Sequence, residues 1–334
     1  MLIVEGKLVY ELDEECARRN QMDLSRYAPY EPKRRVQTDS GTSNWWHYTG
    51  KGVCAAVLDT GAYPHRDFED RIVAFADMVK GKRQSYDDNG HGTHVTGILG
   101  GNGKLSKGRY CGVAPEVKLA VVKVLDEKGK GKLAHMERGI QWVLAYKDIY
   151  GIRIVNISAG TLFTDDAENR KLLDGILNMW NAGLTVCIAA GNEGSRAVTT
   201  PGISTAAITV GTMDDQEMRD HAGRRYVNYS GRGPTDFCIC KPEIVAPGTD
   251  IISTSPMWRR GAKPYCVKSG TSMSVPFVSG AIACLLEKSP KLTNTEIKLL
   301  LRETAQDLGQ PKNHQGWGAL HTERLLSAVE RTSI

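Results

Sequence analysis

The sequence predicts an α/β fold in which a mostly parallel central sheet is covered by helices on both faces. The first observation is a series of continuous apolar runs, each ending in polar or small residues, which is typical of strands buried on both sides. The second is helical periodicity between these runs, so that strands and helices alternate. The third is size, because 334 residues, 41% of them hydrophobic, suffice for one large domain and a short extension.

Five apolar runs are predicted as strands, over residues 52–61, 117–126, 152–160, 184–192 and 206–213. Helices are expected between them, at 92–99, 134–146 and 165–181, and again after the small residues that precede Ser272. In open parallel sheets, function gathers at the carboxyl ends of the strands. Asp59, Ser158 and Asn192 all fall at such ends.

Residues 1–40 differ in character from the rest of the chain. Residues 2–4 and 7–10 suit a short strand or hairpin, and residues 24–35 are rich in proline, tyrosine and charge, which indicates an extended connector. Trp45 and Trp46 mark the expected start of packed structure. We therefore divide the chain into an extension, 1–40, and a main domain, 41–334.

Charge and hydropathy exclude several classes of function. The net charge of +5 is small for this length, so no nucleic-acid partner is predicted. No apolar run approaches the roughly 20 residues of a membrane span, so no membrane partner is predicted either. The N-terminus lacks the apolar core of a secretory signal, which predicts a cytoplasmic location, although secretion by another route stays open. Free thiols are the corresponding expectation for the eight cysteines. Nothing in the sequence indicates the oligomeric state.

Three motifs carry the chemistry: AVLDTG with Asp59, NGHGTHVTG with His91, and SGTSMSVP with Ser272. A serine hydroxyl becomes a nucleophile when an imidazole takes its proton, and the imidazole needs a carboxylate to fix its tautomer. Alone, Ser272 also fits a helix cap. The order Asp, His, Ser excludes an α/β-hydrolase, whose nucleophile comes first.

Together these motifs resemble those of the subtilisin-type serine proteases, the subtilases, over roughly residues 45–329. The resemblance implies a three-layer subtilisin-like fold and a serine endopeptidase that acts on polypeptides. It assigns Asp59 as the orienting carboxylate, His91 as the base and Ser272 as the nucleophile, and it makes His94 a packed helix residue. Asn192, in IAAGNEG, would be an oxyanion-hole donor, whereas alone it fits a turn. A catalytically silent, peptide-binding member of the fold is the alternative.

The resemblance also implies the substrate contacts. One peptide-binding edge would be Ser158, Ala159 and Gly160, and the opposite edge Gly129, Lys130 and Gly131. Ala189, Ala190 and Gly191 would wall the main pocket, with Thr199 near its base. Residues 228–254 are similar to those of subtilases that include cytoplasmic bacterial members.

No cofactor is required for this chemistry. The family resemblance also implies a candidate site for a structural calcium ion. Asp67 matches a calcium ligand of the family, and Glu243 matches an acid at a second cation site. The lysine-containing stretch 102–110 departs from the usual ligand loop, and Asp67 equally suits a helix or turn cap.

The resemblance finally makes residues 1–40 a candidate inhibitory propeptide. Arg26-Tyr27-Ala28-Pro29-Tyr30 loosely resembles the stretch with which cytoplasmic subtilases cover their active site, and Lys33-Arg34-Arg35 would be a place to cut. The alternative is a surface strand that pads the fold.

Overall fold

The computed structural model describes residues 1–30, 47–160, 166–194, 197–216, 218–219, 225–256 and 261–329. Trp45, Trp46, Lys33-Arg34-Arg35 and the boundary at residue 40 lie outside these ranges. The centre is a seven-stranded sheet in the order β11-β8-β7-β6-β3-β5-β4, with all neighbours parallel. Its strands are β3 (Cys54–Asp59), β4 (Ile72–Asp77), β5 (Lys118–Lys123), β6 (Ile152–Ile157), β7 (Thr185–Ala189), β8 (Ile208–Thr212) and β11 (Ile244–Ala246).

All five predicted strands are confirmed, and β4 and β11 are additions that the sequence analysis missed. The residues of β3 are all buried, and they alternate between two cores. Ala55 and Val57 pack under one helix layer, whereas Ala56 and Leu58 pack under the other. This alternation is what makes a strand covered on both faces read as an unbroken apolar run.

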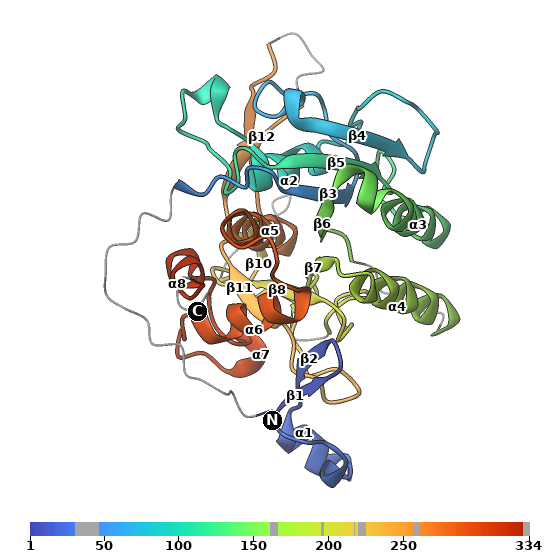
Figure 1. Cartoon of the computed structure of the whole chain (residues 1–334), viewed down its shortest axis with the longest axis vertical. Helices are drawn as coiled ribbons and strands as arrows, with labels where there is room; N and C mark the ends of the chain where they lie inside the picture. The colour runs from blue at the N-terminus through green and yellow to red at the C-terminus, as the bar shows by residue number, and fades with distance from the viewer. Residues whose placement is uncertain are drawn as a thin grey trace.

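Helices cover both faces, as the sequence predicts, so the fold is a three-layer α/β fold (Figure 1). On the right of the figure, α3 (Leu133–Tyr150) and α4 (Asp166–Asn181) form one layer. The other layer contains the long buried α5 (Thr271–Lys288), packed on α2 (His91–Gly100) and on β6, β7 and β8. The C-terminal helices are α6 (Asn294–Thr304), α7 (Lys312–Gln315) and α8 (Thr322–Ser327).

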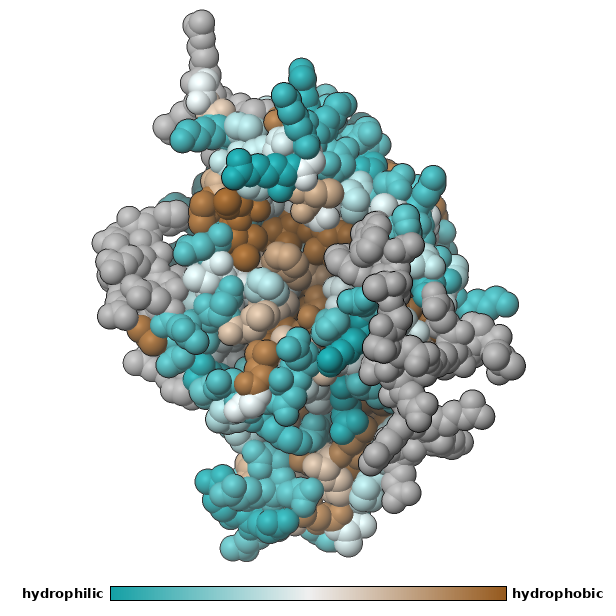
Figure 2. All heavy atoms as spheres, turned by 90° about the vertical axis from the view of Figure 1, so that its left-hand side faces the viewer, coloured by the Kyte–Doolittle hydropathy of each residue, from teal (hydrophilic) through white to brown (hydrophobic). Residues whose placement is uncertain are grey.

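Smaller elements complete the described parts. The hairpin of β12 (Ile251–Thr254) and β13 (Tyr265–Lys268) leads into α5, and β9 (Met218–Arg219) pairs with β10 (Arg225–Tyr226). Figure 2 shows the side of the molecule that is on the left of Figure 1, where hydrophobic residues gather between hydrophilic regions above and below. No helix within the described ranges is both long and apolar enough to cross a membrane.

The described part of the N-terminal extension lies at one end of the molecule, under α4 and α6 (Figure 1). It contains the antiparallel pair β1 (Leu2–Glu5) and β2 (Leu8–Glu11), followed by α1 (Glu14–Arg19). Trp180 of α4 donates its indole N–H to the carbonyl of Lys7 at 2.9 Å, and Lys312 pairs with Glu11. The extension is thus anchored to the helices of the main domain.

Two expectations about this extension are corrected. Arg26-Tyr27-Ala28-Pro29-Tyr30 does not cross the active site, because Pro29 bridges to Ile3 and Tyr30 donates its N–H to the carbonyl of Leu2 at 2.8 Å. These residues therefore lie along the edge of β1. The cysteines are not all free either, since Cys16 of α1 forms a disulfide with Cys238. Asp13 and Glu11 add backbone hydrogen bonds to the same loop, at Cys238 and Cys240.

Candidate active site

Asp59 and His91 form a hydrogen-bonded pair at the carboxyl edge of the sheet. Asp59 ends β3 and is fully buried, and its Oδ1 lies 2.8 Å from Nδ1 of His91. Burial lowers the pKa of His91, but the Asp59 carboxylate outweighs burial, so the pKa lies above its ordinary value. Because a carboxylate only accepts, Nδ1 carries the proton and Nε2 remains a base. A quarter of the His91 side chain is exposed, which leaves the ring accessible.

Gly92 explains why α2 can start so close to Asp59. A Cβ at position 92 would lie 2.1 Å from the carbonyl oxygen of Gly61 and 3.0 Å from Oδ1 of Asp59. Any larger residue would push the helix, and His91 with it, away from the carboxylate. The glycine in the His91-Gly92-Thr93 motif is therefore a requirement of the Asp59–His91 contact.

Asp87 is a positioning residue that the sequence reasoning missed. Its Oδ1 accepts from the Thr60 hydroxyl at 2.9 Å and from the N–H of Gly90 at 2.8 Å, while Oδ2 accepts from the N–H of Thr93 at 2.9 Å. These bonds tie the start of α2 to the residue that follows Asp59. The available signal was an aspartate shortly before a helix start, where Asp side chains bind free backbone N–H groups.

Lys123 stabilises the backbone next to Asp59 and was also missed by the sequence analysis. Its ammonium is fully buried and donates to the carbonyls of Thr60 and Leu125 at 2.6 and 2.9 Å and to Asp88 at 2.7 Å. It is the last residue of β5, within a run of mostly apolar residues, so the sequence analysis assigned it no role of its own. The lysine therefore ties Thr60, which follows Asp59, to Leu125, which lies just after β5.

Ser272 is the second residue of α5, and Pro276 in the same helix helps to define its surroundings. Proline has no N–H, so the carbonyl four residues earlier, that of Ser272, loses its helical donor. The hydroxyl of Ser158 replaces that donor at 3.1 Å. In return, the hydroxyl of Ser272 donates to the carbonyl of Ser158 at 2.9 Å. This reciprocal pair joins the start of α5 to the end of β6.

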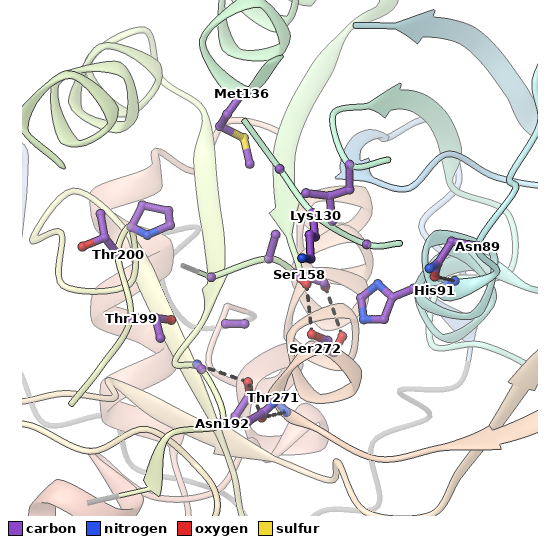
Figure 3. Close-up of a pocket in the computed structure, with 18 of the residues that line it drawn as sticks. Asn89, His91, Lys130, Met136, Ser158, Asn192, Thr199, Thr200, Thr271 and Ser272 are labelled. Atoms are coloured by element: carbon purple, nitrogen blue, oxygen red, sulfur yellow. Dashed lines mark hydrogen bonds between the residues drawn. The ribbon is translucent and has the colours of Figure 1, made fainter. Parts of the chain in front are cut away.

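Figure 3 shows Ser272 beside the ring of His91 on one side of the cavity. The Ser272 hydroxyl donates to the carbonyl of Ser158 in this arrangement. Catalytic hydrogen bonds often form only when substrate is bound. Buried polar groups hold α5 and Ser158 together. Asn156 accepts from Ser279 of α5 and donates to Ser158, both at 2.9 Å.

Asn192 is held so that its amide faces the cavity. Its Oδ1 accepts from the N–H and the hydroxyl of Thr271, at 3.0 and 3.1 Å. Since an N–H needs an acceptor, these bonds fix which end of the amide is oxygen and leave the NH₂ group as a donor. Gly270, at φ 141°, passes close to that NH₂ group, where a Cβ would lie 3.3 Å from Nδ2. The N–H groups at the start of α5 are neighbours of this donor.

His91, Asn192 and Ser272 line one cavity of about 650 Å³. Both predicted edges border it, Gly129, Lys130 and Gly131 on one side and Ser158, Ala159 and Gly160 on the other, together with Ala189, Gly191, Asn192, His91 and Ser272. Figure 3 shows Met136 and the pair Thr199 and Thr200 at separate parts of the lining. Asp59 lies behind His91 rather than in the lining.

Thr199 lines the cavity and lies against both Gly160 and Gly191. A Cβ at Gly160 would meet its hydroxyl oxygen at 2.1 Å, and one at Gly191 would meet it at 2.5 Å. Ala190 differs from its neighbours Ala189 and Gly191, because it is fully buried and does not line the cavity. Its carbonyl accepts the N–H of Thr199 at 3.0 Å, so Ala190 supports the pocket from behind.

His94 has no place in the cavity. It is fully buried, and its Nε2 lies 3.0 Å from the carbonyl of Ile251 and 3.2 Å from that of Cys266. Burial, with Lys268 and His91 nearby, lowers its pKa to about 3. The ring is therefore a neutral donor that fixes the β12–β13 hairpin to α2, which agrees with a packed helix residue.

Asp67 and Glu243, the two candidate cation ligands, both accept hydrogen bonds from protein donors. Asp67 accepts from the N–H of Leu105 at 3.0 Å and from the Tyr265 hydroxyl at 2.7 Å, so it caps the 102–110 loop. Glu243 accepts from the ammonium groups of Lys241 and Lys298, at 2.7 and 3.0 Å. Two positive charges stand where a metal ion was expected. Across the described ranges, no group of three or more His, Cys, Asp or Glu side chains is arranged to hold a metal ion.

Comparison with known proteins agrees with this geometry. The model of the Subtilase family matches residues 50–318. Serine protease AprX of Bacillus subtilis (strain 168) is 38% identical over 344 residues, which cover 96% of this chain and 77% of that protein. Thermostable alkaline protease of Halalkalibacterium halodurans is 34% identical over 276 residues, 82% of this chain and 68% of that protein.

Subtilisin BL of Lederbergia lenta is 32% identical over 276 residues, which cover 82% of this chain and 91% of that protein. The family match spans the sheet strands from β3 to β11, and it includes the Asp59, His91 and Ser272 motifs. The chain therefore belongs to the subtilase family and is a subtilisin-like serine endopeptidase.

Proposed function

We propose that Asp59, His91 and Ser272 form the catalytic triad of this protease. The observation that carries the proposal is the 2.8 Å contact between Asp59 and His91 at the wall of a cavity that Ser272 also lines. His91 Nε2 takes the proton of the Ser272 hydroxyl as Oγ attacks a peptide carbonyl. Asp59 holds the imidazole in the required tautomer and stabilises the imidazolium.

The negative charge of the tetrahedral intermediate needs donors that are in place before the reaction. The NH₂ group of Asn192 and the backbone N–H of Ser272 fill this role, and the start of α5 adds its dipole. His91 then passes its proton to the leaving amine, so the C–N bond breaks and an acyl-enzyme forms. Water, activated by His91, releases the acyl group and restores Ser272.

The substrate is an extended polypeptide segment between the two cavity edges. Backbone pairing to such edges gives affinity that does not depend on sequence, and the depressions toward Met136 and Thr199 would select side chains.

Ser272→Ala tests this proposal against the silent, peptide-binding alternative. Peptidase activity should fall by about 10⁶ in kcat, the loss seen when a subtilisin triad is broken at its nucleophile. Ser269→Ala, in the neighbouring turn, should keep wild-type activity. A fluorophosphonate probe, mapped by mass spectrometry, should label Ser272 in the wild type. Unlabelled wild-type Ser272, or an active Ser272→Ala protein, would refute the triad.

A further inference from the structure

The rim of the active-site cavity is strongly basic. Among the described residues, Lys128, Lys130, Lys132 and Lys268 all line it, against one acid, Glu193. Four lysines and one glutamate leave an excess of three positive charges there, whereas the whole chain carries only +5. The positive charge of this protein is therefore concentrated at the site where substrate binds.

The two acids that directly precede Lys128 in sequence are already engaged. Asp126 accepts from the backbone N–H groups of Lys128 and Lys130, at 2.9 and 2.8 Å. Glu127 pairs with Lys80 at 3.1 Å. Neither carboxylate lines the cavity, so the lysine ammonium groups on the rim are left to face substrate and solvent.

The lysines fall on two sides of the reacting serine. Lys128, Lys130 and Lys132 belong to the edge that follows β5, and Figure 3 shows the Lys130 side chain crossing the middle of the cavity. Lys268 ends β13, on the side of His91, and its charge is near enough to lower the pKa of that imidazole. Because His91 must protonate the leaving amine, the leaving segment of a substrate lies on the side of Lys268.

We propose that this protease selects peptide segments that carry acidic side chains on both flanks of the cleaved bond. Lys130 would contact an acidic side chain on the acyl side, and Lys268 one on the leaving-group side. The inference rests on the proposed function, since it assumes that Ser272 is the nucleophile. A cavity with walls of low dielectric focuses such a field and raises both the rate of encounter and the binding of an anionic segment.

The test uses quenched fluorescent peptides that differ only in charge. Each set has the same residues at the cleaved bond, with Glu, Gln or Lys at one position either before or after it, and mass spectrometry verifies the bond that is cut. At low ionic strength, Glu peptides should have a higher kcat/KM than Gln peptides, and Lys peptides a lower one. Each favourable contact should contribute about 1.5- to 5-fold, and added salt should weaken it.

Two variants separate the two flanks. Lys130→Gln should remove the preference for Glu on the acyl side and keep the preference on the leaving side, and Lys268→Gln should do the reverse. Lys104→Gln is the matched control, because Lys104 is exposed and does not line the cavity. A charge reversal, Lys130→Glu, should favour the Lys peptide over the Glu peptide on the acyl side.

Equal kcat/KM for Glu and Gln peptides in low salt would overturn the proposal, as would a preference that survives both lysine substitutions. These ratios are measured within active enzyme, so they can fail while Ser272→Ala still abolishes cleavage. Conversely, an active Ser272→Ala protein would refute the triad whatever the ratios show. The two proposals therefore fail by different measurements.

Discussion

Asp59 and Glu243 are both buried carboxylates, but their surroundings differ. Asp59 contacts one titratable partner, His91, and its Oδ2 has no hydrogen-bond partner among the described residues. Glu243 contacts two ammonium groups, Lys241 and Lys298, with both oxygens engaged. The first arrangement allows the local charge to change when the imidazole gains a proton during the reaction, whereas the second pairs charges within a packed region.

The two arrangements also differ in what they hold together. The Lys241 ammonium donates to the carbonyl of Ser204 and the Lys298 ammonium to those of Thr205 and Ala207, at 2.6 to 3.0 Å. This segment follows Thr199, Thr200 and Pro201 of the cavity lining. The Glu243 cluster thus braces the chain behind the pocket, while the Asp59 pair acts in front of it.

Of the substitutions that test this contrast, Asp59→Asn should have the largest effect, and the effect should be on activity alone. The carbonyl of the introduced amide would still accept from the N–H of Thr60, which Oδ1 of Asp59 binds at 2.7 Å. The neutral amide would no longer stabilise the imidazolium as the carboxylate does, however, which should lower kcat by about 10⁴. Thermal unfolding should stay close to that of the wild type. A marked drop in melting temperature would mean that Asp59 is a structural carboxylate like Glu243, and the contrast would fail.

Glu243→Gln should show the opposite pattern. It would leave two buried ammonium groups without a countercharge, which should cost about 3–5 kcal/mol of folding free energy in denaturant titrations. Specific activity of the folded fraction at low temperature should change little. Glu14→Gln is the control, because the exposed ion pairs of Glu14 should contribute less than about 1 kcal/mol. Equal effects of the two substitutions would contradict the buried-cluster argument.

The smallest effect concerns alkaline pH and sharpens the same contrast. Burial is the main cause that lowers the pKa of Lys241 to about 8, with Lys298 adding to it and Glu243 opposing it. The unfolded chain keeps that proton up to its ordinary pKa of 10.5, so between about pH 8 and 10.5 it binds more protons than the folded chain. Stability from this group should therefore rise with pH across the window, and be lost as the pH falls through about 8.

The measurement is the difference in unfolding free energy between wild type and Lys241→Met at several pH values. Groups that titrate in both proteins and lie far from Lys241 cancel in that difference. A gap that moves in favour of the wild type from pH 8 to 10 is expected. A flat difference would show that the buried cluster does not release a proton in this range.

Local sequence patterns predicted much of the fold, because apolar runs and helical spacing are properties of neighbouring residues. Asp59, His91 and Ser272 were recognisable since each lies in a short motif with small residues around it. The Glu243 cluster was not, because Lys298 lies on a helix 55 positions away and its burial depends on tertiary packing. β11 was missed for a related reason, since three residues are too few for a periodic signal.

The lysines at the cavity rim also show what the sequence alone could not predict. Lys130 was predicted as a main-chain contact, and nothing in its own segment indicated that Lys268 would join it across the site. Asp87 and Lys123 likewise act through hydrogen bonds to Thr60, which lies in a different segment of the chain. In each case the residue type was visible, but its partners were brought together only by the folded sheet.

The disulfide between Cys16 and Cys238 closes a covalent ring that spans 222 positions of the chain. A single cut inside that ring opens it without releasing a fragment. If a protease cut at Lys33-Arg34-Arg35, the first residues would stay bound through Cys16, and a non-reducing gel would show an intact mass. Departure of the extension thus requires two chemistries together, hydrolysis of one peptide bond and reduction of one disulfide, so the fold makes its release conditional on both.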